Sequence, residues 1–277
     1  MCLAAIAWQT HPRYRLVLAA NRDEFHARPA LPIDLWSDRE GMLAGRDLQG
    51  GGTWLGLHRS GRFGLITNFR DQLAPLQAPT RGQLIPDFLD GPQPPDGYLA
   101  QLAAEAPRYA GFNLLLGDLQ NLWYASNRHP DFARPLTAGI YALSNHLLDT
   151  PWPKLARLRD ALSNWLALPS VTRQDTQAAS FEDAEPVWQA LSDRSPAPQH
   201  RLPNTGISLE WEKLLSSPFI VHPEYGTRAS TVMLIGWDNS ILVEERSYGT
   251  DGGLTHRQSW KTVVDQWPPE PNVALRL

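Results

Sequence analysis

Two short apolar runs open the chain, and together they predict a buried β-hairpin. Residues Leu3–Trp8 and Tyr14–Ala20 are separated by the turn-forming segment Gln-Thr-His-Pro-Arg. Both runs are almost continuously hydrophobic, which is typical of strands that are covered on both faces. We therefore expect this hairpin to lie inside the protein rather than at its surface.

The order of the other predicted elements favours an α+β fold. Strand hairpins occupy both ends of the chain, whereas helices cluster between about residues 81 and 192. We find no internal repeat, low-complexity tract or domain boundary, so we expect a single domain over residues 1–277. The Pro-rich residues from about 266 to 277 are expected to form a loose tail.

Periodicity and turn residues place the remaining elements. The expected helices are Arg81–Leu89, Tyr98–Ala106, one that spans Leu155–Leu166, and Ser180–Ser192. Residues Pro29–Glu40 are expected to be irregular because they are rich in proline and polar residues. The strands expected after the first hairpin are Thr53–His58, a strand within Phe63–Arg70, Phe112–Leu116, Leu122–Ala125, Ile140–Leu143, Val232–Trp237, Ile241–Tyr248 and Thr255–Val263.

Composition argues against several classes of protein. The net charge is -4 and the basic residues are scattered, which argues against nucleic-acid binding. A single cysteine rules out an internal disulfide and fits a reducing compartment. No apolar run approaches the ~20 residues that cross a bilayer, and the amino terminus lacks a basic leader. We therefore expect a cytoplasmic protein with no membrane span.

The sole cysteine, Cys2, stands directly behind the initiator methionine. Removal of Met1 would leave a thiol and a free α-amino group on one residue. The amino group titrates near pH ~8 and the thiol near ~8.5, so at neutral pH one can take the other's proton. The alternative is that Cys2 is a small apolar residue that begins a buried strand behind a retained Met1.

Polar residues stand at the ends of three predicted strands. Asn68 closes the strand within Phe63–Arg70, and Asn145 follows Ile140–Leu143. The third group directly follows the second strand of the first hairpin, so it is expected close to Cys2. Solvated loops and ordinary strand-end capping are the alternative explanation for all three groups. The members of the third group are Asn21, Arg22, Asp23 and Glu24.

These motifs together resemble the NRDE family, also called the transport-and-Golgi-organisation family. The resemblance runs from Met1 to about Tyr248. The family is similar in turn to N-terminal-nucleophile (Ntn) cysteine hydrolases of the penicillin V acylase and bile salt hydrolase branch. That similarity implies a four-layer αββα sandwich, in which two stacked antiparallel sheets lie between helical layers. The matching blocks are residues 21–24, 51–56, 67–70, 143–145 with 148–154, and 225–231.

The resemblance implies a role for several residues. Cys2 matches the nucleophile, and Asp23 matches the carboxylate that orients the α-amino group. Asn68 resembles a strand end near the oxyanion hole, and Asn145 resembles the asparagine whose side-chain amide donates to the oxyanion. Arg228 loosely matches a late arginine near the nucleophile.

One position departs from the hydrolase pattern. The hydrolases carry an arginine where this chain has Ala20, so we expect Arg22 to supply that charge from a neighbouring position that points the other way along the strand. Arg22 and Arg228 are expected either to tune the thiol, to recognise a substrate carboxylate, or to form structural salt bridges. Asn21 and Glu24 are expected to support catalysis or to bind substrate.

Two functions follow from these residues. The first is an amidohydrolase in which Cys2 attacks a carboxamide of a small or amphipathic substrate, with no cofactor and no metal. The alternative is a non-catalytic carrier or chaperone of a large apolar ligand such as haem, although none of the eight histidines has ligand spacing. A role as a Golgi scaffold rests on the family name alone. The sequence leaves the substrate and the oligomeric state open.

Overall fold

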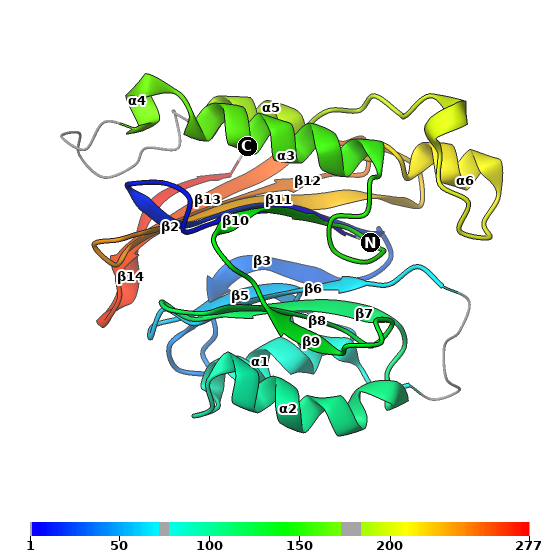
Figure 1. The fold of residues 1–277 in the computed structure, drawn as a ribbon. Helices are drawn as coiled ribbons and strands as arrows, with labels where there is room; N and C mark the ends of the chain where they lie inside the picture. Colours follow the sequence, from blue (N-terminus) through cyan, green and yellow to red (C-terminus); the bar gives the residue numbers. More distant parts are fainter. Residues whose placement is uncertain (1, 72–77, 173–183, 277) are drawn as a thin grey trace.

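Two seven-stranded sheets stack face to face in the computed structural model, which describes residues 2–71, 78–172 and 184–276 (Figure 1). The helices α3 and α5 cover the outer face of one sheet, and α1 and α2 cover the outer face of the other. All strand pairs within both sheets are antiparallel. The predicted α+β class and αββα arrangement are confirmed.

The first sheet contains the amino-terminal hairpin near its centre. Its strand order is β10-β1-β2-β11-β12-β13-β14. Because β1 and β2 have neighbours on both sides, the sheet brings the amino terminus next to strands from the last third of the chain. The strands are β1 Cys2–Trp8, β2 Tyr14–Phe25, β10 Gly139–Leu143, β11 Tyr225–Gly236, β12 Ser240–Tyr248, β13 Leu254–Val263 and β14 Gln266–Arg276.

The second sheet follows the chain order without a crossover, from β3 to β9. Its strands are β3 Ala30–Leu35, β4 Met42–Asp47, β5 Leu55–His58, β6 Phe63–Asn68, β7 Phe112–Gly117, β8 Leu122–Ser126 and β9 Ala133–Pro135. The helices are α1 Leu84–Asp90, α2 Pro95–Glu105, α3 Pro153–Leu166, α4 Pro169–Thr172, α5 Glu185–Leu191 and α6 Leu209–Leu214. None of these described helices qualifies as a membrane-spanning segment.

The hairpin β1–β2 is buried on both faces, as its apolar runs predicted. Leu3 and Ala5 pack toward α3 and α5, whereas Ala4 and Ile6 pack between the two sheets. This alternation follows from the two-residue repeat of a strand. The two core layers on either side of the first sheet therefore depend on the same short strand.

Four strands were not expected from the sequence: β4, which lies between β3 and β5, and three strands that lie at sheet edges. β3 replaces part of the predicted irregular segment, β9 was missed, and β14 replaces the predicted loose tail. Each of these three edge strands contains proline, which lacks an N–H donor and is tolerated in a strand whose outer side needs no partner. The predicted helix Ser180–Ser192 appears from Glu185 onward, and its expected start lies outside the described residues.

Candidate active site

Cys2 is the first residue of β1, and its side chain faces the space between the sheets. It lies opposite Arg22 in the β1–β2 register and two residues before Ala4, which packs between the sheets. Its exposed fraction is 9%. Cys2 lines a pocket of about 380 Å³, called the Cys2 pocket below. The sole thiol of the chain is therefore buried at the wall of a cavity.

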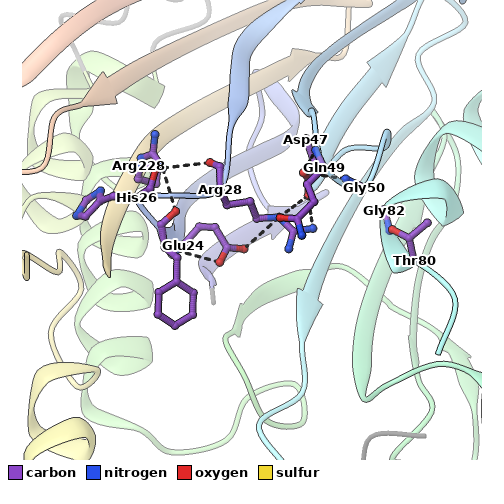
Figure 2. A network of polar contacts seen from close by, with 10 residues as sticks. Glu24, His26, Arg28, Asp47, Gln49, Gly50, Thr80, Gly82 and Arg228 are labelled. Atoms are coloured by element: carbon purple, nitrogen blue, oxygen red, sulfur yellow. Dashed lines mark hydrogen bonds and ion pairs between the residues drawn. The ribbon is translucent and has the colours of Figure 1, made fainter. Parts of the chain in front are cut away.

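The wall of the Cys2 pocket is rich in charge. Figure 2 shows Arg28 between Glu24 and Asp47. The Arg28 Nε donates to Asp47 Oδ2 over 2.8 Å, and a second Arg28 nitrogen lies 2.6 Å from the same oxygen. Glu24 Oε2 lies 3.8 Å from Arg28 Nε. The charged residues of the lining are Arg22, Asp23, Glu24, Arg28, Asp47 and Arg81.

Burial raises the pKa of the Cys2 thiol above its ordinary value. The positive charge of Arg22 and a hydrogen bond from the backbone of Asp23 act in the opposite direction, but they do not cancel the effect of burial. The thiol is therefore protonated at neutral pH and needs a base before it can act as a nucleophile.

The four polar residues after Ala20 lie inside strand β2 rather than in a loop beyond it. Strand alternation divides them between two layers. Arg22 and Glu24 face the Cys2 pocket between the sheets. Asn21 faces the helical layer, where its Nδ2 donates to the carbonyls of Leu191 in α5 and of Pro218 after α6, and Asp23 lies on the same side of β2. The expectation of a polar cluster near Cys2 is correct, but its location at a strand end is wrong.

Arg22 points to the same face of β2 as Ala20, so the expectation that it would point the other way is wrong. The two residues are two positions apart, and a strand repeats its side-chain direction every two residues. Ala20 packs between the sheets, and Arg22 reaches the Cys2 pocket from that same face. The guanidinium of Arg22 therefore lies in the layer that holds the thiol.

Asp23 is 1% exposed and accepts a hydrogen bond of 2.7 Å from the Thr227 hydroxyl on β11. Burial raises the pKa of this carboxyl, while the charge of Lys154 acts to lower it. Asp23 is next in sequence to Arg22, the residue opposite Cys2, and it also contributes to the lining of the Cys2 pocket. The register of β2 thus brings the carboxylate to the first residue of β1.

Asn68 and Asn145 meet each other beside β1. Asn145 is fully buried, and its Nδ2 donates to the Asn68 carbonyl over 2.8 Å. The preceding residue, Ser144, donates from its hydroxyl to the Cys2 carbonyl over 2.8 Å. These bonds join the ends of β6, β10 and β1. Asn68 lines the Cys2 pocket, whereas Asn145 is not in the described lining and contacts it through the bond to Asn68.

The backbone N–H of Asn68 points away from β7. The Phe69 N–H donates to the Gly111 carbonyl on the β7 side, and the Ile66 N–H donates to the Trp54 carbonyl on the β5 side. Because N–H directions alternate along a strand, the Asn68 N–H points to the β5 side. Strand β5 begins only at Leu55 and so does not extend alongside Asn68, which lies at the edge of the Cys2 pocket.

Arg228 is not part of the described lining of the Cys2 pocket. Its Nη1 donates to the carbonyls of Phe25, His26 and Arg28, at 3.1, 3.2 and 3.4 Å, and so it holds the turn between β2 and β3 (Figure 2). Arg228 lines a neighbouring cavity instead. The resemblance predicted an arginine near the nucleophile, but Arg228 lines the cavity next to the Cys2 pocket.

Lys154 was not expected at the site. It is 1% exposed in the first turn of α3, and its Nζ donates to the Leu215 carbonyl over 2.9 Å. Burial lowers the pKa of Lys154 to about 8, although the charge of Asp23 acts to raise it. The sequence contained a signal, because Lys154 precedes Leu158 and Leu162 by four and eight residues and so shares their apolar helix face.

No group of three or more His, Cys, Asp or Glu side chains that could hold a metal ion occurs in the described ranges. Carboxylates near Cys2 instead meet cations, as Asp47 does with Arg28. What the arrangement offers chemically is a thiol, a nearby carboxylate and amide donors around a polar pocket.

Comparison with known proteins finds similar solved structures at low sequence identity. Among solved structures, the N-acylethanolamine-hydrolyzing acid amidase ortholog of Caenorhabditis elegans has a TM-score of 0.45 at 11% identity, covering 84% of this chain and 92% of that one. A mutant conjugated bile acid hydrolase from Clostridium perfringens has a TM-score of 0.44 at 9% identity, covering 99% and 97%.

Sequence comparison identifies the family. The Transport and Golgi organization protein 2 homologs of Bos taurus and Homo sapiens are each 33% identical to this chain, covering 96% and 95% of it and 99% and 97% of their own lengths. The Drosophila melanogaster protein is 25% identical over 96% of this chain and 98% of its own length. The model of the family "TANGO2: Transport and Golgi organisation 2" matches residues 1–250. The chain therefore belongs to the TANGO2 family.

Proposed function

We propose that this protein is an amidohydrolase that uses Cys2 as an amino-terminal nucleophile and cleaves a non-peptide carboxamide C–N bond. The observation that carries the proposal is that the sole thiol, Asp23 and Asn68 line one pocket, while the Asn145 side-chain amide donates to the Asn68 carbonyl at its wall. These groups come from β1, β2, β6 and the segment after β10. A small or amphipathic substrate suits the size of this pocket.

The reaction begins with loss of Met1, which frees the α-amino group of Cys2. The thiol gives its proton to that amino group, and the sulfur attacks the carboxamide carbon. On collapse of the tetrahedral intermediate the C–N bond breaks, the ammonium group protonates the departing amine, and a thioester remains. Water then attacks the thioester and gives one proton to the amino group, which returns it to the sulfur as the carboxylic acid leaves.

Two donors suit the oxyanion of the tetrahedral intermediate. The backbone N–H of Asn68 points to the pocket side of β6, and the Asn145 amide has a second N–H beyond the one that it gives to Asn68. Loss of one such donor typically raises the barrier by ~2.7–4 kcal/mol. Asp23 would hold the freed amino group, since its carboxylate lies beside the residue opposite Cys2.

The charged lining favours this proposal over the carrier of a large apolar ligand. A pocket for a group such as haem is expected to present mainly apolar and aromatic side chains. The Cys2 pocket presents three arginines and three carboxylates instead. Absorbance titration with haem tests the alternative. A carrier should bind haem, and the Cys2→Ala substitution should leave that binding unchanged.

Intact mass spectrometry after brief treatment with iodoacetamide tests the proposal. We expect the mature protein to lack Met1 and to gain one carbamidomethyl group, with no gain in the Cys2→Ala control. A panel of chromogenic amides then reports turnover, and Cys2→Ser should slow it while the protein stays folded. A retained Met1, or turnover that survives Cys2→Ala, would contradict the proposal.

A further inference from the structure

A second cavity of about 240 Å³ adjoins the Cys2 pocket. The two share one wall, because Arg22 and Trp54 line both. The guanidinium carbon of Arg22 lies 4.3 Å from the centroid of the Trp54 ring, so the two side chains stack. The remaining polar lining of the second cavity includes Arg228, Glu245, Ser247 and His256.

Arg22 is buried and has no ion-pair partner among the described residues. Its exposed fraction is 6%, and its guanidinium forms no ion pair or hydrogen bond with any described residue. Stacking on Trp54 uses the flat face of the guanidinium and leaves its N–H edge for a planar acceptor. A buried cation that lacks a carboxylate is strongly destabilised unless another anion meets it.

A second guanidinium lines the same cavity. Arg228 uses Nη1 for three backbone carbonyls, and within the described ranges it has no carboxylate within ion-pair distance. Burial lowers the pKa of Arg228, and the charge of Arg22 lowers it further, whereas the charge of Glu24 acts to raise it. The two guanidiniums therefore repel each other across the cavity, and an anion between them would remove that repulsion.

The carboxyl group in this cavity does not fill that role. Glu245 on β12 is 2% exposed, and its Oε1 accepts the Ile33 N–H over 2.8 Å. Its Oε2 accepts the Thr231 hydroxyl over 3.2 Å. Both oxygens therefore accept hydrogen bonds from groups other than the arginines. Burial raises the pKa of Glu245 to about 7, although the charge of Arg22 acts to lower it, so the carboxyl is only partly ionised at neutral pH.

We propose that the second cavity binds an oxyanion, a carboxylate or a phosphate group, between Arg22 and Arg228. Both guanidiniums match the planar, two-oxygen edge that such groups present. Because Arg22 also lines the Cys2 pocket, the anion is the distal end of the molecule whose carboxamide meets Cys2. This last step rests on the proposed function, whereas anion binding itself does not.

Calorimetric titration of the Cys2→Ala protein with inorganic phosphate and with succinate tests the anion site without turnover. Ionic strength is held constant with sodium chloride. We expect saturable binding of one anion, at least tenfold weaker in Arg22→Gln and in Arg228→Lys. Arg228→Lys keeps a donor for the turn carbonyls, and thermal unfolding verifies that each variant is folded. The stronger of the two titrants identifies carboxylate or phosphate as the group.

Two control variants make this titration decisive. Arg59→Gln removes the same charge from an exposed pair with Glu40, outside both cavities, and should leave binding unchanged. Arg81→Gln removes a cation from the Cys2 pocket alone. Binding that weakens equally in Arg81→Gln and Arg228→Lys would overturn the assignment to the second cavity, as would the absence of saturable binding.

A pair of chromogenic amides, one with a distal carboxylate or phosphate and the other its methyl ester, tests the link to catalysis. We expect a KM at least tenfold lower for the anion, and Arg228→Lys should abolish this preference. Equal KM values in the wild-type protein would overturn the link. Anion binding without cleavage of either amide would instead count against the proposed function and leave the anion site standing.

Discussion

The pH dependence of stability provides a sharp test of the inner face of β12. Glu245 is buried between the sheets, and burial raises its pKa from 4.5 to about 7. Its folded pKa lies above its unfolded pKa, so the folded state binds the proton more tightly. The stability that this proton provides is fully present below pH ~4.5 and is lost as the pH rises through about 7.

The magnitude follows from the same numbers. Each unit of pKa corresponds to ~1.4 kcal/mol, so the wild-type protein should lose on the order of 3 kcal/mol from this residue between pH ~4.5 and pH ~7. Glu245→Gln mimics the protonated group, since its amide oxygen can accept the Ile33 N–H and its nitrogen can donate to Thr231. The variant should lack this loss altogether.

Urea unfolding monitored by tryptophan fluorescence at half-unit steps from pH 4 to pH 8 measures the effect. The informative quantity is the difference in unfolding free energy between wild type and variant, because other titrating groups cancel in it. Glu244→Gln is the matched control: it breaks ion pairs with Arg246 and Arg257 and should cost roughly 1–3 kcal/mol at neutral pH. A difference between wild type and Glu245→Gln that does not change with pH would refute the reasoning.

Three further substitutions test other parts of the site. Lys154→Met removes a buried amine whose pKa burial lowers to about 8, so the folded state favours the neutral amine. In urea unfolding, the free energy of unfolding of wild type should therefore rise by up to ~3 kcal/mol relative to the variant between pH ~8 and ~10.5. Asn145→Ala should lower kcat ~10²–10³-fold on a cleavable amide while Cys2 alkylation persists. Asn21→Ala leaves two carbonyls and the Ser230 hydroxyl without their bonds and should cost at least about 2 kcal/mol in chemical unfolding.

The central elements of the fold could be predicted because their residues obey a local rule. The hairpin β1–β2 is apolar on both faces, and it is buried on both faces. The helix α3 shows its apolar stripe at helical spacing. The edge strands β3, β9 and β14 could not be predicted in this way, because they carry prolines and have only one neighbour to satisfy.

The sequence predicted which residues form the candidate site, but not on which side of the first sheet each side chain lies. Cys2, Asp23 and Asn68 come together as expected, because each lies at a strand end or beside one in register. The position of Arg228 was predicted wrongly because a one-residue β-bulge between Thr227 and Ala229 makes Arg228 an extra residue outside the regular alternation, which no local pattern reveals. Predicting that Lys154 belongs to the site would have required knowing that Asp23 lies across the helix–sheet interface from it.

The segment from residue 21 to residue 24 shows why one motif can serve two purposes. Since strand alternation sends Asn21 to the helical layer, substitutions at Asn21 are expected to act through its buried hydrogen bonds. Arg22 and Glu24 face the cavities, so substitutions there should change ligand binding with less effect on stability. A conservative exchange at Asn21 and one at Arg22 should therefore separate a stability phenotype from a binding phenotype. If both exchanges changed stability and binding in the same proportion, the division of β2 into a structural face and a ligand face would be wrong.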